Sequence, residues 1–211
     1  MPRLTTGDAR LPAVPAVDAV FLDIGNVLVF HDNQMLYDRL AALGGTSSAA
    51  VERALETVWD PCHRGQVAGD ELRRAVSNAT GRPLDPETFR RVWSCHLRVH
   101  EEVMPLVESM LGRAKMYLLS NTNAAHFEEV RSLLPVLEKF DGYVLSHELG
   151  VVKPDCAIFD EALRRSGVTA ARAAYFDDLE PYVSASRAMG IQGYVFTDAT
   201  KFRRDLTELG F

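Results

Sequence analysis

The sequence predicts an α/β fold in which a Rossmann-like parallel-sheet core carries an inserted α-helical cap. Two observations predict it. From residue 115 onward, short apolar segments alternate with amphipathic helical segments, which is typical of a parallel sheet with helices on its faces. One further apolar segment, residues 19–23, stands near the N-terminus and is followed by a block with helical periodicity and little strand signal, residues 34–113. We therefore expect this block to be an insertion after the first βα unit.

The change of pattern along the chain sets the expected domain boundaries. We expect the core in residues 17–30 and 106–211 and the helical cap in residues 31–105. Residues 1–16 are rich in proline and show no periodicity, so they are expected to form a flexible tail. The 211 residues are enough for one core domain with one such insertion.

Four helices are predicted in the inserted block. Apolar residues recur at three- and four-residue spacing in "QMLYDRLAAL", "SSAAVERALETVW", "GDELRRAVSNA" and "PETFRRVWSCHLRV". Helix starts are indicated by Ser47 or Ser48, by Gly69 with Asp70, and by Asp85 before a proline.

The core is expected to contain five strands and the helices between them. The strands are residues 19–23 and then "KMYLLS", "GYVLS", "AAYFD" and "GYVF". The helices are "NAAHFEEVRSLL", "DCAIFDEALRRSG", "EPYVSASRAMG" and "RRDLTEL". Strands that alternate with helices in this way pair in parallel.

Composition and charge exclude several classes of protein. The net charge is -6 and the 23 lysines and arginines are scattered, so we expect no nucleic-acid partner. No uncharged apolar run is long enough to span a membrane or to act as a signal peptide, so no membrane association is expected. The three cysteines are widely spaced, which predicts neither disulfides nor a zinc cluster and fits a cytoplasmic location.

Polar side chains follow the predicted strands at one edge of the sheet. Asp23 ends the first strand, Ser120 ends the second, Ser146 follows the third, and Asp177 and Asp178 end the fourth. Ligands of open α/β sheets bind outside the carboxyl ends of the strands, so these residues are expected to converge. Three carboxylates at such short distances repel one another unless a cation lies among them. Oxygen ligands favour Mg²⁺, whose coordination is completed by water and a substrate phosphate.

The four motifs resemble those of the haloacid dehalogenase (HAD) superfamily of aspartate-nucleophile hydrolases with a helical cap. "FLDIGNVL" is similar to the first motif, "YLLSNT" to the second, Lys153 in "GVVKPDCAIF" to the third and "AYFDD" to the fourth. The motifs occur in the family's order and extend from about Val20 to Phe196. The resemblance implies a phosphatase that acts on a small phosphorylated metabolite, with a sugar phosphate as one candidate.

The resemblance also implies a role for each residue of the motifs. Asp23 would be the nucleophile that forms an aspartyl-phosphate, and Ser120 and Asn121 would donate hydrogen bonds to phosphate oxygens. Lys153 would balance the negative charge. The Mg²⁺ ligands would be Asp23, Asp178 directly, Asp177 less directly, and the backbone carbonyl of Gly25. Attack by a carboxylate divides one difficult displacement into two easier ones.

Each of these residues also has a purely structural explanation. Asp23 could be a turn residue, and Ser120 could cap the following helix. Lys153 could be a solvated loop charge. Asp177 and Asp178 could stabilise a helix start through its dipole. All four explanations would have to coincide at one sheet edge, so we favour the catalytic interpretation.

Gly25 departs from the commonest pattern of the family. Most phosphatases of the superfamily carry a second aspartate two residues after the nucleophile, and it acts as general acid and then as general base. A general acid contributes about 10²–10⁴ in rate. Some members with a DxGN motif resemble sugar-phosphate phosphatases. Here His31 or Asp32 could deliver the proton, or the substrate could have a good leaving group. His31 could equally be an ordinary surface histidine.

Two rivals to the phosphatase remain open, and the cap is expected to select the substrate. A 2-haloacid dehalogenase also lacks the second aspartate, but the Asp177–Asp178 pair argues against it. A non-catalytic protein that binds a metabolite is supported by Gly25 alone.

In the cap segment "WDPCHRGQVAGDEL", Arg64 could meet an anionic or hydroxyl-rich part of the substrate. It could equally be a cation at a helix C-terminus.

Overall fold

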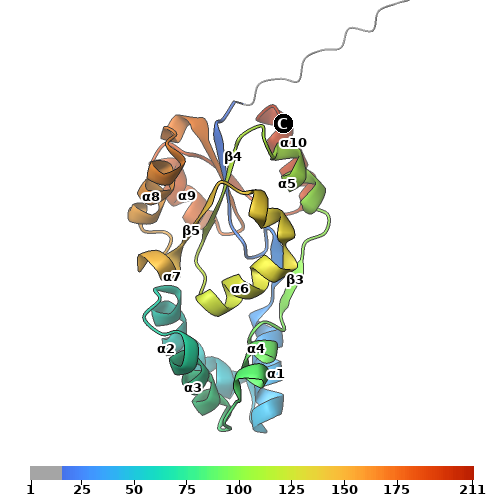
Figure 1. Ribbon diagram of the computed structural model, residues 1–211, viewed down its shortest axis with the longest axis vertical. Coiled ribbons are helices and arrows are strands. Elements are labelled where there is room, and N and C mark those ends of the chain that lie inside the picture. Colours follow the sequence, from blue (N-terminus) through green and yellow to red (C-terminus); the bar gives the residue numbers. More distant parts are fainter. Residues whose placement is uncertain (1–15) are drawn as a thin grey trace, which may run out of the picture.

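The computed structural model of the protein describes residues 16–211, so the predicted tail, residues 1–16, lies almost wholly outside the described residues. The molecule is elongated, with a parallel sheet and its flanking helices at one end and a group of four helices at the other (Figure 1). No helix in residues 16–211 is both long enough and apolar enough to cross a membrane.

Five parallel strands form the sheet, in the spatial order β5–β4–β1–β6–β7. Their bounds are β1 Ala19–Leu22, β4 Lys115–Ser120, β5 Gly142–Leu145, β6 Ala173–Asp177 and β7 Gln192–Val195. The central strand β1 pairs on both sides, with Leu22 opposite Leu118 of β4 and Phe176 of β6. The predicted α/β fold class is confirmed, and the four strands at whose ends the predicted acidic and hydroxyl side chains lie, β5, β4, β1 and β6, are neighbours in the sheet.

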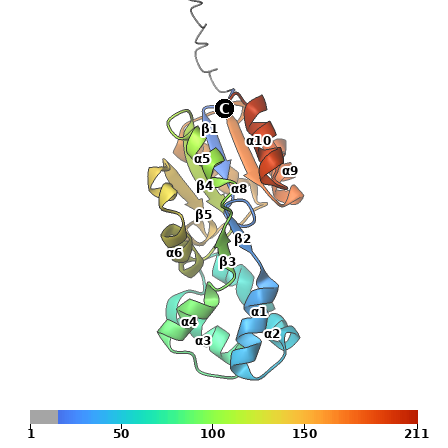
Figure 2. The same cartoon turned by 90° about the vertical axis from the view of Figure 1, so that its right-hand side faces the viewer.

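Alternate side chains of the strands pack on opposite faces of the sheet. On one face, Val20 and Leu22 pack against α5, α6 and α10. On the other face, Phe21 packs against α8 and α9. Figure 2 shows α5 and α10 side by side over the first face. The bounds are α5 Met104–Met110, α6 Ala124–Leu133, α8 Cys156–Ser166, α9 Glu180–Ala188 and α10 Ala199–Glu208. Three short elements complete the fold: η1 Pro135–Lys139, α7 Ser146–Leu149 and η2 Ala170–Arg172.

The four helices at the other end, which we call the helical unit, enclose a hydrophobic cluster of their own. They are α1 Asn33–Gly44, α2 Ser48–His63, α3 Gly69–Thr80 and α4 Pro86–Trp93. The side chains of Asp32, Ser47 and Asp85 accept hydrogen bonds from the first turns of α1, α2 and α4. The helix α3 has the predicted start at Gly69 but no side-chain cap.

The predicted fourth helix is too long. The segment "PETFRRVWSCHLRV" was expected to be helical throughout, but α4 ends at Trp93. Leu97–Val99 instead forms β3, which pairs antiparallel with β2, Val29–His31. Leu97 and Val99 alternate with a polar residue, and pairing with β2 satisfies their backbone groups, which the helical pattern did not reveal. This two-stranded ribbon joins the helical unit to the sheet (Figure 2).

The ends of α1 and α3 touch at a glycine. A Cβ atom placed on Gly44 would lie 2.1 Å from the carbonyl oxygen of Thr80, which is backbone and has no freedom to turn away. Gly44→Ala should therefore force the two helices apart and lower the free energy of unfolding by about 1–3 kcal/mol. Ala42→Ser, on the exposed side of the same helix, is the control and should change it by less than about 0.5 kcal/mol. Urea unfolding measures both, and equal stability of the two variants would contradict the close contact.

Candidate active site

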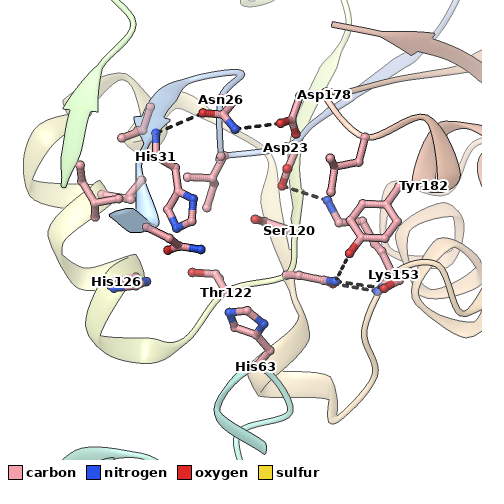
Figure 3. A pocket seen from close by; sticks show the side chains of 18 of the residues that line it. Asp23, Asn26, His31, His63, Ser120, Thr122, His126, Lys153, Asp178 and Tyr182 are labelled. Carbon is pink, nitrogen blue, oxygen red and sulfur yellow. Dashed lines mark hydrogen bonds and ion pairs between the residues drawn. The ribbon is translucent and has the colours of Figure 1, made fainter. Parts of the chain in front are cut away.

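A cavity of about 380 Å³ lies between the carboxyl edge of the sheet and the helical unit (Figure 3). The sheet edge contributes most of the residues predicted from the sequence, and they line the cavity together: Asp23, Gly25, Ser120, Asn121, Lys153 and Asp178. The ribbon and the helical unit contribute His31, Trp59 and His63. Residues far apart in the sequence thus meet where the fold leaves a hollow.

The three predicted acids come from neighbouring strands. Asp23 follows β1, and its backbone N–H donates to the carbonyl oxygen of Phe176 in β6 at 3.0 Å. Asp177 is the last residue of β6 and Asp178 follows it. One carboxylate oxygen of each acid lies within 4.8 Å of those of the other two. The parallel pairing of β1 with β6 therefore brings the acids together.

Lys153 lies between two of these acids. Its Nζ is 2.9 Å from Oδ1 of Asp23 and 2.6 Å from Oδ2 of Asp177, and it donates to the carbonyl oxygen of Leu119 at 3.2 Å. The lysine side chain is fully buried. Burial lowers the pKa of Lys153, but the two adjacent carboxylates outweigh this effect and raise it above its usual value. The ammonium group is therefore charged wherever the protein is folded near neutral pH.

Asn121 holds the backbone of Lys153. Its Oδ1 accepts a hydrogen bond from the Lys153 N–H at 2.7 Å, and its Nδ2 donates to the Lys153 carbonyl oxygen at 3.0 Å and to the Tyr182 hydroxyl at 3.4 Å. The sequence motif suggested that Asn121 donates to a phosphate. In the structure its side chain orients the backbone of the lysine loop.

Asp177 is completely buried, and protein donors engage both of its oxygens. Oδ2 accepts hydrogen bonds from Lys153 and from the hydroxyl group of Tyr175, and Oδ1 accepts one from the N–H of Leu179 at 2.8 Å. Tyr175 was not predicted as part of the site. The sequence contained a signal for Tyr175, because it lies two residues before Asp177 and residues two apart on a strand point to the same side.

Asn26 is a second residue that the sequence reasoning missed. It has a φ of 52°, a left-handed conformation that asparagine tolerates better than most residues. Its Nδ2 donates to Oδ2 of Asp178 at 2.8 Å, and its Oδ1 accepts from the N–H of His31 at 3.2 Å (Figure 3). The turn after β1 thereby holds both Asp178 and the end of β2.

The site carries an excess of negative charge that fits a divalent cation. Burial raises the pKa of Asp23 to about 6, with Lys153 opposing the rise and Asp177 adding to it. Three carboxylates and one ammonium group share the site, so a cation would favour ionisation of Asp23. The oxygen donors of Asp23 and Asp178 suit Mg²⁺, while Asp177 is already occupied by protein donors.

Aromatic rings and imidazoles form the wall opposite the acids. Trp59 stacks on Trp93 with a centroid distance of 5.1 Å, and Trp93 stacks on His126 at the same distance. His63 lies 5.8 Å from Trp59. Burial lowers the pKa of His63 to about 4, and burial also lowers the pKa of His31 and His126. The wall is therefore uncharged at neutral pH.

Besides Asp177 and Ser146, which are fully buried, two predicted residues lie outside the cavity. Oδ1 of Asp32 accepts hydrogen bonds from the N–H groups of Gln34 and Met35, at 2.9 Å and 3.2 Å, and so caps α1. Arg64 is paired with Asp60, and its Nη1 donates to the carbonyl oxygen of Gly150 at 3.3 Å. Of the two candidate proton donors, only His31 lines the cavity.

The chain belongs to the haloacid dehalogenase-like hydrolases, whose family model matches residues 17–190. This confirms the resemblance of the four motifs and the prediction of a hydrolase. The match covers the sheet edge with all three acids.

Individual relatives include two phosphatases. The chain is 27% identical to the sesquiterpene phosphatase astK of Aspergillus oryzae over 154 residues, 72% of this chain and 78% of that protein. It is 26% identical to D-ribitol-5-phosphate phosphatase of Bacteroides thetaiotaomicron over 200 residues, 89% of this chain and 96% of that protein. Among solved structures, a HAD family enzyme of B. thetaiotaomicron in complex with magnesium and inorganic phosphate has a TM-score of 0.79 at 21% identity, covering 86% of this chain and 95% of that chain.

A buried histidine beside the cavity should make the stability of the protein depend on pH. His96 is only 1% exposed, neither ring nitrogen has a hydrogen-bond partner among the described residues, and burial lowers its pKa to about 4. As pH falls from 7 to 5, His96 takes up a proton in the unfolded chain but not in the native protein. The wild type should therefore lose about 2 kcal/mol of stability relative to His96→Leu.

Urea unfolding of both proteins at pH 7 and pH 5 measures this difference. The other histidines are common to both proteins and cancel in the comparison. Parallel loss of stability in the two proteins would show that His96 is not held neutral.

Proposed function

We propose that the protein is a Mg²⁺-dependent phosphatase that hydrolyses a small phosphorylated metabolite through an aspartyl-phosphate on Asp23. The observation that carries the proposal is the pairing of Asp23 with the buried Lys153 at the mouth of a cavity that also presents Ser120 and Asp178. The phosphatases among the relatives and the fold neighbour that binds magnesium and phosphate support it.

The two oxygens of Asp23 have different surroundings. Oδ1 is paired with Lys153, which leaves Oδ2 to attack phosphorus. A bond between Oδ2 and phosphorus forms as the bond to the leaving oxygen breaks, and water then hydrolyses the aspartyl-phosphate. The Ser120 hydroxyl and the Lys153 ammonium group, which line the cavity beside Asp23, would meet the phosphate oxygens as charge accumulates on them. Mg²⁺, held by Asp23, Asp178 and the Gly25 carbonyl with Asp177 acting indirectly, would supply further charge neutralisation.

We propose that residues 31–105, which include the helical unit, act as a cap over this site. Trp59 and His63 come from α2 yet line the same cavity as Asp23. A substrate bound to Asp23 would therefore contact the helical unit. A sugar or polyol phosphate is the substrate class we favour, on the DxGN motif and the similarity to the ribitol-phosphate enzyme.

The rival activities receive less support from the site. A dehalogenase needs no metal, yet three carboxylates meet here and Asn26 is bonded to Asp178. A non-catalytic binding protein would not need a buried lysine paired with Asp23. The free thiols of Cys62, Cys95 and Cys156 agree with the cytoplasmic location we propose.

Asp23→Asn should reduce turnover of p-nitrophenyl phosphate to background, because the amide is not a nucleophile, while leaving the circular dichroism spectrum unchanged. Removal of divalent cations with EDTA should abolish wild-type turnover, and added Mg²⁺ should restore it. Asp38→Asn, on the exposed face of α1, is the matched control and should retain activity. Undiminished turnover in Asp23→Asn would rule out the covalent route.

The glycine at position 25 should make the rate sensitive to the leaving group. Asp32 lies outside the cavity, and burial lowers the pKa of His31, so its imidazole is largely unprotonated at neutral pH and has no proton ready for the leaving oxygen. A Cβ on Gly25 would meet only Oδ2 of Asp23, at 4.0 Å, so the backbone there has room for a Cβ atom. Gly25→Asp should accelerate ethyl phosphate hydrolysis about tenfold or more and p-nitrophenyl phosphate hydrolysis much less.

A series of phosphate esters with different leaving-group pKa values measures this sensitivity. The wild type should show a steep dependence, Gly25→Asp a shallow one, and His31→Ala the same dependence as the wild type. A shallow dependence in the wild type that becomes steep in His31→Ala would assign proton transfer to His31 instead.

A further inference from the structure

We infer that His63 is a specificity residue that hydrogen-bonds a hydroxyl group of the substrate, so that the site selects a single phosphate ester on a neutral, hydroxyl-bearing body. The inference rests on the proposed phosphatase function and adds the substrate chemistry to it. It replaces Arg64, the cap residue suggested by the sequence, with its neighbour.

His63 is the last residue of α2, and its ring lines the cavity. In Figure 3 the ring extends from the end of α2 toward the sheet edge, where Ser120 and Thr122 lie. Arg64, one residue further, is turned away from the cavity and bonded to Asp60 and Gly150. The helical unit therefore presents an imidazole, and not a guanidinium group, to a bound substrate.

The position of His63 is fixed by direct contact between the helical unit and the sheet domain. The Arg64 guanidinium group donates to the carbonyl oxygen of Gly150 at 3.3 Å. At Gly65, which has a φ of 70°, a Cβ atom would lie 2.1 Å from the carbonyl oxygen of His147. The two residues after His63 thus rest on α7 and the residue that ends it, and this contact delivers the ring to the cavity.

The charges around the cavity exclude a second anionic group on the substrate. Among the described residues that line the cavity, Lys153 is the only lysine or arginine, and two carboxylates already surround it. The opposite wall consists of neutral rings. A second phosphate or a carboxylate on the substrate would be buried there without a cation, which is costly.

The ring of His63 has hydrogen-bonding capacity to offer. It makes no hydrogen bond to another described residue, and burial lowers its pKa to about 4, so the ring is neutral at pH 7. A neutral imidazole has one donor and one acceptor nitrogen, which complements a hydroxyl group, itself donor and acceptor. The face of Trp59 beside it suits the C–H surface of a polyol or sugar.

The test compares a pentitol 5-phosphate with pentyl phosphate, which has the same carbon chain without the hydroxyls, and with p-nitrophenyl phosphate. The wild type should prefer the pentitol ester in kcat/KM. His63→Phe should raise KM for the pentitol ester about three- to tenfold, the loss of one neutral hydrogen bond. It should leave KM for the other two esters nearly unchanged. His63→Gln, which keeps a donor and an acceptor, should recover part of the preference, and Arg53→Gln on the exposed side of α2 should behave as the wild type.

Two further measurements separate selectivity from catalysis. In an Asp23→Asn background, calorimetry should show that His63→Phe weakens binding of the pentitol ester and not of pentyl phosphate. Gly65→Ala should reproduce the selectivity loss with His63 intact, because it displaces the contact with His147. Gly69→Ala is its control, since Gly69 also has a positive φ, 52°, but no atom within 4 Å of an added Cβ.

Equal kcat/KM of the wild type for the pentitol and pentyl esters would overturn the inference while leaving the phosphatase intact. So would a uniform loss on all three esters in His63→Phe without recovery in His63→Gln. Failure of the wild type to hydrolyse any of the three esters with Mg²⁺ would overturn the phosphatase, and the inference with it.

Discussion

The buried ammonium group of Lys153 is the point on which the site depends. Asp23 and Asp177 lie on neighbouring strands, so parallel pairing brings their carboxylates together whether or not that arrangement is favourable. A lysine between them offsets the repulsion, and removal of one partner from such a buried group is strongly destabilising. The burial that strengthens the attraction between Lys153 and the carboxylates also raises the pKa of Asp23. One ammonium group does not neutralise the three carboxylates of the site, and a divalent cation would neutralise the remaining negative charge.

The surroundings of Lys153 divide the polar residues into two groups. Asn121 holds the lysine backbone, and Tyr175 and the Leu179 N–H bind Asp177, so these residues orient the charged groups. Asp23, Ser120 and Asp178 line the cavity and are the groups that a substrate would meet. Such separation keeps the reactive groups at a fixed spacing, which is the condition for electrostatic stabilisation of a transition state without reorganisation.

The sequence was sufficient for the sheet and for the positions of the acids, because both follow from local patterns. Each strand is an apolar run, and each acid sits at the end of one. Residues 97–99 were assigned to a helix because their pairing partner, residues 29–31, is distant in the sequence. The roles of Asn26 and His63 depend on contacts between elements far apart in the chain, and no periodicity encodes them.

The cavity lies between a charged surface and an uncharged one, and this contrast separates recognition of the phosphate from recognition of the rest of a substrate. The sheet edge is charged and is built from strand ends whose geometry the parallel pairing determines. The opposite wall is made of indole rings and of imidazoles whose pKa values are lowered by burial, so it presents no charged group to a substrate. The phosphate end of a substrate would therefore be recognised by the charged groups of the sheet edge. Substitution of any one of them disturbs the whole ion-pair network, so these groups tolerate little change. The other end would meet side chains on α2 that can be replaced one at a time without disturbing the acids.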